Sequence, residues 1–157
     1  MRQSTTSQSR PELAAESSAP GYSRKAVIPA KADAFCAAFM PHPAAVGNMR
    51  DSTAAFLSRF GLAGQLAGSV VLVVSELVTN AIKHGHGLVE LEIHVAGGTV
   101  TVSVTDENPA PAVLNQADPD DISGRGMALV AAYSDKWGSS GEKTWCEFRD
   151  DRAGSAA

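Results

Sequence analysis

The stretch of residues 70–87 constrains the fold most strongly, because it carries one long helical pattern. Its apolar residues recur every three or four positions, the spacing that places them on one face of an α-helix against a core. These residues are Val70, Val71, Val74, Leu77, Val78, Ala81 and Ile82. The pattern predicts a helix over about residues 65–84, ended by the glycines at positions 85 and 87.

The same helix is expected to carry a polar face. At about 100° per residue, Glu76, Asn80, Lys83 and His84 project within roughly 100° of one another. A carboxylate can accept a proton, and an amide oxygen is a ligand that Mg²⁺ accepts beside water and phosphate. The solvated side of an ordinary amphipathic helix shows the same pattern, so this segment alone leaves both interpretations open.

Beyond the helix the apolar period changes to two, which predicts a β-hairpin. Apolar and polar residues alternate on both sides of the glycine pair at 97 and 98, so the hairpin should bury one face. The apolar positions are Leu91, Ile93, Val95, Val100, Val102 and Val104.

The flanking segments complete the expected order of elements. Residues 24–29 read as a short strand, and a helix should follow Pro43 and end at Gly61. Residues 108–126 are too rich in proline, acid and glycine for regular structure and form a candidate lid. A short helix from Gly126, a turn, and a last strand over residues 144–149 then give an α+β fold, a two-layer sandwich with helices on one face of a mostly antiparallel sheet.

Length and composition favour one soluble domain. The 157 residues, 44% of them hydrophobic, support a flexible tail at 1–23, a domain at 24–150 and a frayed end at 151–157. A net charge of -4 offers no basic field for nucleic acid or anionic lipid. Cys36 and Cys146 lack a CxxC pair, which disfavours a zinc site. With no secretory apolar core and no run of about 18 apolar residues, we expect a cytoplasmic protein without a membrane contact.

Three further motifs are ambiguous when each is taken alone. The glycines of GRGMALV, at 124 and 126, permit an anion to approach a helix N-terminus, although a simple turn would read the same way. Asp106 ends the second hairpin strand, where it would either cap a turn or accept a hydrogen bond from the amine of adenine. Thr144 is also an ordinary β-branched strand residue.

Together and in this order, the motifs resemble the GHKL (Bergerat) ATP-binding superfamily over about residues 25–149. The E-x-x-x-N-A-x-K-H pattern from Glu76 is similar to its first box, Asp106 to its adenine box, and GRGMALV to its glycine box. One departure is that Asp106-Glu107-Asn108 stands where many members have Asp-x-Gly, so the backbone beside adenine is less permissive here.

The resemblance implies a Bergerat-type fold and a role for each matching residue. Asn80 would ligate Mg²⁺, Glu76 would act as general base, and Asp106 would hold adenine, with Thr144 near the base. Gly124, Arg125 and Gly126 would contact the phosphates of ATP. Lys83, His84 and Met127 complete the implied nucleotide site.

The compact chain is most similar to the bacterial anti-sigma factor serine kinases within this superfamily. Those proteins bind a sigma factor and phosphorylate a serine of an anti-anti-sigma (STAS-type) partner, and a homodimer is possible. An alternative is a non-catalytic ATP-binding module that sequesters a regulator. An orphan ATPase subunit is a third interpretation, disfavoured because no transducer domain is present.

Overall fold

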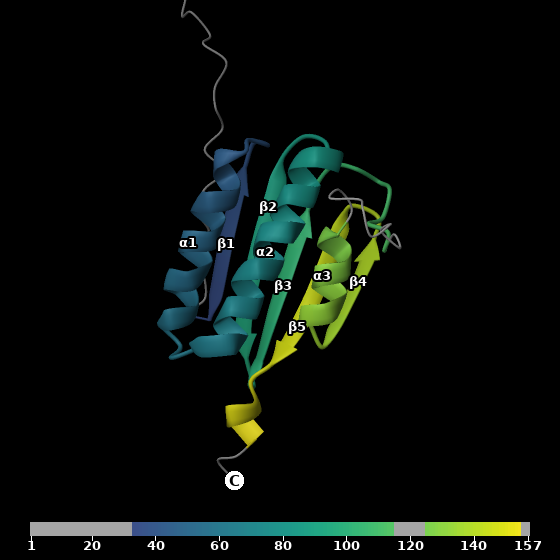
Figure 1. Ribbon diagram of the computed structural model, residues 1–157. Coiled ribbons are helices and arrows are strands. Elements are labelled where there is room, and N and C mark those ends of the chain that lie inside the picture. The colour runs from purple at the N-terminus through teal and green to yellow at the C-terminus, as the bar shows by residue number, and fades with distance from the viewer. Residues whose placement is uncertain (1–32, 115–124, 155–157) are drawn as a thin grey trace, which may run out of the picture.

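The computed structural model describes residues 33–114 and 125–154 and shows one five-stranded sheet (Figure 1). Every neighbouring pair of strands is antiparallel, and the strand order is β1-β2-β3-β5-β4. The strands are β1 Ala34–Phe39, β2 Val89–Ala96, β3 Thr99–Thr105, β4 Lys136–Ser140 and β5 Lys143–Arg149. The predicted hairpin is therefore β2 and β3, and both glycines of its turn, Gly97 and Gly98, have positive φ.

Three helices cover one face of this sheet, which confirms the predicted α+β sandwich (Figure 1). They are α1 Ala44–Ser58, α2 Gly64–His84 and α3 Gly126–Tyr133. The start of α1 follows Pro43, where the backbone N–H of Ala44 donates to His42 Nδ1 at 3.1 Å. After β5, η1 Asp151–Gly154 forms a single 3-10 turn, and the Arg152 guanidinium donates to the carbonyl of Gly61 at 3.1 Å.

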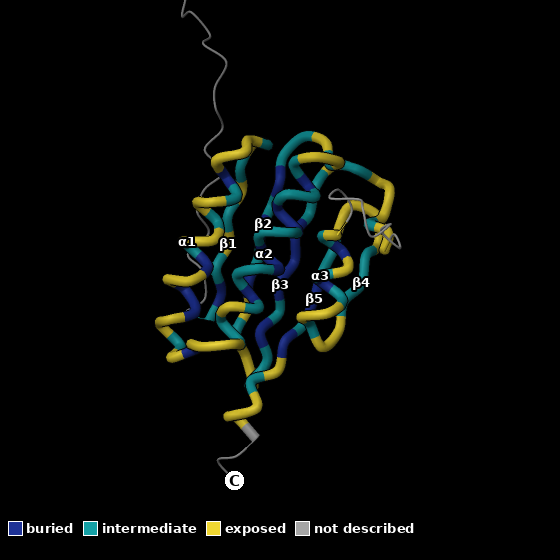
Figure 2. Tube along the Cα trace, in the orientation of Figure 1, coloured by how far each residue is buried: buried dark blue, intermediate teal, exposed yellow. Residues whose placement is uncertain are grey.

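The core lies between α2 and the helix-facing side of the sheet (Figure 2). The alternation predicted for the hairpin is observed, since register pairs such as Leu91 with Val104 and Ile93 with Val102 are buried together. From α2, the buried residues are Val70, Val73, Val74, Leu77, Val78 and Ala81. Burial of this apolar surface on folding, worth roughly 1.5 to 3 kcal/mol for each large side chain, is what holds α2 across the centre of the sheet.

By length and composition alone, α2 is also apolar enough to cross a membrane, because an 18-residue window within its 21 residues has a mean hydropathy of 1.5. Its buried face instead packs into the core cluster beside β2, β3 and β5. The polar residues Glu76 and Asn80 interrupt its other side. We therefore interpret α2 as the core helix of a small soluble-type domain.

The first strand differs from the sequence prediction. The strand expected at residues 24–29 lies outside the described residues, and the observed β1 occupies a segment to which the sequence analysis assigned no element. Alanine has weak strand propensity, so the alternation of Phe35 and Phe39 with small residues carries little signal. Because the local strand propensity is weak, β1 is stabilised by its pairing with β2, which runs from Ala34 opposite His94 to Phe39 opposite Val89.

The sequence predicts a turn from position 137 to the last strand, and this prediction is wrong for residues 137–140, which belong to β4. Glycine and lysine are depleted in strands, so the composition of β4 gives little strand signal. The Trp145 ring lies over Gly138, where an added Cβ would meet the ring at 2.8 Å. Gly138 thus accommodates its cross-strand neighbour, and tertiary packing overrides local propensity.

Candidate functional site

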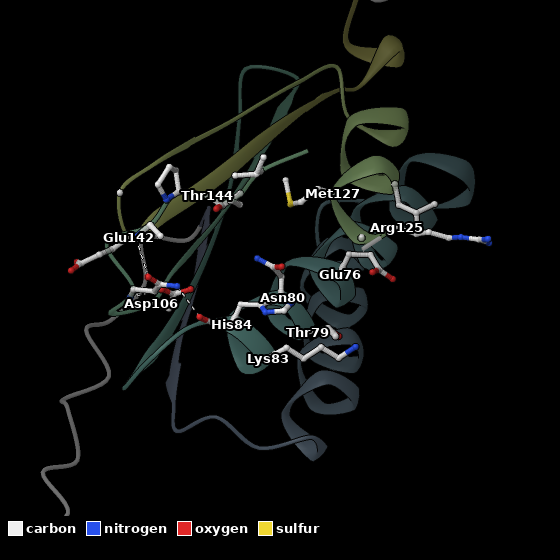
Figure 3. Close-up of a pocket in the computed structure, with 18 residues that line it drawn as sticks. Glu76, Thr79, Asn80, Lys83, His84, Asp106, Arg125, Met127, Glu142 and Thr144 are labelled. Carbon is white, nitrogen blue, oxygen red and sulfur yellow. Dashed lines mark hydrogen bonds between the residues drawn. The ribbon is translucent and has the colours of Figure 1, made fainter. Parts of the chain in front are cut away.

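A cavity of about 520 Å³ opens between α2, α3 and the ends of β3 and β5 (Figure 3). This volume lies within the range of about 300 to 1,000 Å³ that is usual for small-molecule sites. Nine of the ten residues singled out in the sequence line it, and the tenth, Gly124, lies outside the described residues. The nine are Glu76, Asn80, Lys83, His84, Asp106, Arg125, Gly126, Met127 and Thr144.

Helix α2 forms one wall of the cavity with its polar face. Figure 3 shows Asn80 between Asp106 on one side and Glu76 on the other. Glu76 and Asn80 are partly buried, whereas Lys83 and His84 in the last turn are exposed. Among the residues that the structure describes, no hydrogen bond engages the Asn80 side chain. Its amide is therefore available to a ligand.

Asp106 stands at the end of β3, held by its own backbone and by its neighbours. Its N–H donates to the carbonyl of Glu142 at 3.0 Å, and its Oδ1 accepts the N–H of Asn108 at 2.7 Å. An added Cβ on Gly85 would lie 2.7 Å from Asp106 Oδ2. The half-buried carboxylate is thus confined at the C-terminal end of α2, where it lines the cavity.

Thr144 reaches the cavity from β5 and belongs to a short hydrogen-bonded chain. Its hydroxyl lies 3.0 Å from that of Ser139 in β4, and Ser139 Oγ accepts the N–H of Ala112 at 2.7 Å. These contacts tie the segment after β3 to the β4–β5 hairpin. The wall formed by residues 110–113 is fixed by this connection.

The glycine turn places the start of α3 directly against α2. Gly126 is the first residue of α3, and an added Cβ there would lie 3.0 Å from Glu76 Oε2. A larger side chain at this position would displace the carboxylate. The positive end of a helix dipole favours negative charge, and the Glu76 carboxylate lies at this N-terminal end of α3.

Other lining residues were not found from the sequence. They are Thr79, Asn108, Ala110, Pro111, Ala112, Val113, Leu129, Gly141 and Glu142. Thr79 precedes Asn80 on α2, but a threonine in a helix does not by itself indicate a binding role. The contribution of Glu142 is its backbone carbonyl, which no side-chain pattern encodes.

The donor set fits a magnesium ion that takes most of its ligands from outside the protein. In the described residues no group of three or more His, Cys, Asp or Glu side chains gathers into a metal site. Mg²⁺ commonly takes only one or two protein ligands together with water and phosphate oxygens. The available Asn80 amide, one helical turn from Glu76, matches that requirement.

Comparison with known proteins agrees with this geometry. The family model described as the histidine kinase-like ATPase domain matches residues 39–149, which run from the end of β1 through β5. A comparison with curated proteins found no match. Since the matched region contains the whole cavity and most of the chain, the protein belongs to the histidine kinase-like ATPase domain family, a membership that implies ATP binding.

Proposed function

We propose that this protein is a cytoplasmic anti-sigma regulator that binds a sigma factor. In this proposal it uses Mg-ATP to phosphorylate a serine of an anti-anti-sigma, STAS-type partner. The observation that carries the nucleotide-binding part is the convergence of three separate motifs on one cavity: Asn80 on α2, Asp106 after β3 and Gly126 at the start of α3. The regulatory part rests on the sequence resemblance to the anti-sigma kinases.

In the proposed complex, adenine lies at the sheet end of the cavity and the phosphates at the helix end. Asp106 accepts the exocyclic amine of adenine, and Thr144 lies beside the base. Gly126 presents its backbone N–H to the phosphates, with Arg125 and Lys83 supplying positive charge. Asn80 would hold magnesium, which would supply charge neutralisation at the phosphate oxygens.

The proposed transfer is a displacement at the γ-phosphorus. A bond forms from the partner's serine Oγ to phosphorus, while the bond to the β–γ bridging oxygen breaks and ADP leaves with its electron pair. The serine proton passes to the carboxylate of Glu76. The close approach of Glu76 to Gly126 supports this role, because it brings the proton acceptor to the phosphate end of the cavity.

A phosphate-transfer assay with the protein's own partners tests this proposal. Partners are recovered with the full chain as bait, identified by mass spectrometry, and incubated with the protein, Mg²⁺ and ATP carrying a labelled γ-phosphate. The proposal expects label on a serine of a STAS-type partner and recovery of a sigma factor. ATP binding without any transfer would instead favour a non-catalytic module that sequesters a regulator.

A further inference from the structure

We propose that Asn108 is a positioning residue that holds the Asp106 carboxylate in the orientation needed to read the adenine amine. The inference deepens the proposed nucleotide site and rests on ATP binding there. Asn108 occupies the position at which many members of the GHKL superfamily have glycine.

Asn108 uses both its backbone and its side chain to join three parts of the site. Its N–H donates to Asp106 Oδ1 at 2.7 Å, and its Nδ2 donates to the carbonyl of His84 at 2.7 Å. Its Oδ1 accepts the N–H of Ala110 at 3.0 Å. One half-buried residue therefore contacts the Asp106 carboxylate through its backbone and joins the end of α2 to the cavity wall through its side chain.

The bond to His84 has a local reason. The last four carbonyls of a helix lack partners within the helix, and His84 is the final residue of α2. Because the Asn108 amide satisfies one of these carbonyls, it anchors the segment after β3 to the same helix that presents Asn80. A glycine at position 108 has no side chain with which to make this connection.

As a result, the two carboxylate oxygens of Asp106 differ in their hydrogen bonding. Oδ1 accepts the N–H of Asn108, whereas Oδ2 lies against Gly85 and, within the described part of the chain, accepts no hydrogen bond. An ionised carboxylate has about four lone-pair sites, so Oδ2 keeps its full capacity as an acceptor. The side-chain bond to His84 fixes the backbone of Asn108, whose N–H holds Oδ1, and Oδ2 is left for a ligand's amine.

Asn108 also supports the cavity wall through Ala110, so the test must separate orientation of Asp106 from wall shape. Purine riboside triphosphate serves this purpose because it carries the same phosphates as ATP but has hydrogen in place of the 6-amino group. Loss of wall shape weakens both nucleotides alike. Loss of carboxylate orientation weakens ATP alone.

The experiment measures both nucleotides by calorimetry on wild type, Asn108→Ala, Asn108→Asp and the control Asn48→Ala. Asn48 is exposed on α1 and does not line the cavity. Asn108→Asp keeps an oxygen for the Ala110 N–H but removes the donor to His84. Circular dichroism establishes that each variant is folded, and the ratio of the two affinities is insensitive to the folded fraction.

We expect wild type and Asn48→Ala to prefer ATP about tenfold or more, the scale of one charge-assisted hydrogen bond. Both Asn108 variants should lose most of that preference while binding of purine riboside triphosphate changes by less than about threefold. An unchanged preference in Asn108→Ala, or recovery of the wild-type preference in Asn108→Asp, overturns the positioning role and leaves the ATP site standing. Wild type that binds neither nucleotide overturns the proposed function itself.

Discussion

Gly85 and Asp106 lie in contact at the end of α2, where an added Cβ at position 85 would come within 2.7 Å of Asp106 Oδ2. The same Cβ would also press on the carbonyl of Ala81. Gly85 has a φ of -76, so its backbone does not require glycine. The Ala81 carbonyl and the Asp106 carboxylate both approach position 85 closely, and together they exclude a side chain there.

Gly85→Ala should therefore weaken ATP binding by about tenfold or more, because the Asp106 carboxylate must move and lose alignment with the adenine amine. Gly68→Ala is the matched control, since an added Cβ in that turn of α2 meets nothing within 4 Å. The control should keep its affinity and gain roughly 0.5 to 1 kcal/mol of helix stability. Calorimetry and thermal unfolding measure both effects, and equal affinities in the two variants would refute the steric argument.

Asn80→Ala should lower ATP affinity strongly in the presence of Mg²⁺, because it removes the amide assigned to the ion. EDTA should weaken binding to the wild type in the same way. The variant, already lacking the metal ligand, should respond much less to EDTA. If neither the substitution nor the chelator changes the calorimetric affinity, Asn80 is not a magnesium ligand.

Glu76→Gln separates chemistry from binding. Glutamine keeps the size and hydrogen bonding of the side chain but cannot take the serine proton, so ATP affinity should stay nearly intact. Transfer to a partner serine should fall by about 10²-fold or more, the usual scale for removal of a general base. Single-turnover assays with labelled ATP measure this rate, and an unchanged rate would assign the base to another residue.

The two free thiols should differ in reactivity. Cys36 is exposed on β1, whereas Cys146 is buried, and burial raises the pKa of the Cys146 thiol to about 12. An aromatic disulfide reagent at pH 8 should titrate one thiol in the folded protein and two in denaturant, because the thiolate is the reactive form. Cys36→Ser should leave the folded protein unreactive, and rapid reaction of Cys146 would contradict the observed packing.

The same pKa shift predicts how stability changes in alkali. A pKa raised by folding means that the unfolded chain releases its proton first, so the stabilisation from Cys146 is complete below about pH 9 and is lost as the pH rises toward 12. Chemical unfolding at increasing pH should show this loss. Cys146→Ala should lack this component of the pH dependence, although it is less stable overall.

The parts of the fold that the sequence predicted are those with strong periodicity. The apolar stripe of α2 and the alternation across the Gly97-Gly98 turn each bury one face, and both elements lie where their patterns indicate. The strand β4 was not predicted because its glycine, Gly138, is needed to make room for the neighbouring Trp145 ring, a contact that exists only in the folded protein. The strand β1 depends in the same way on pairing with β2.

The site shows a similar division. Residues with distinctive chemistry in a recognisable order, such as Asn80, Asp106 and Gly126, could be selected in advance and do line one cavity. Asn108 could be noted only as a departure from glycine, because its function depends on the position of the His84 carbonyl in space. The roles assigned to these residues in binding and transfer stay predictions.

The most direct test of the account is calorimetric titration of ATP into wild type, Asp106→Ala and the control Asp51→Ala. Asp51 is exposed on α1, outside the cavity, so its variant should bind as the wild type does. Asp106→Ala removes the acceptor for the adenine amine at a cost of about 1 to 3 kcal/mol or more, so ATP affinity should fall by about tenfold or more while the fold is retained. A folded Asp106→Ala protein with wild-type ATP affinity would contradict the assignment of this cavity as the adenine site.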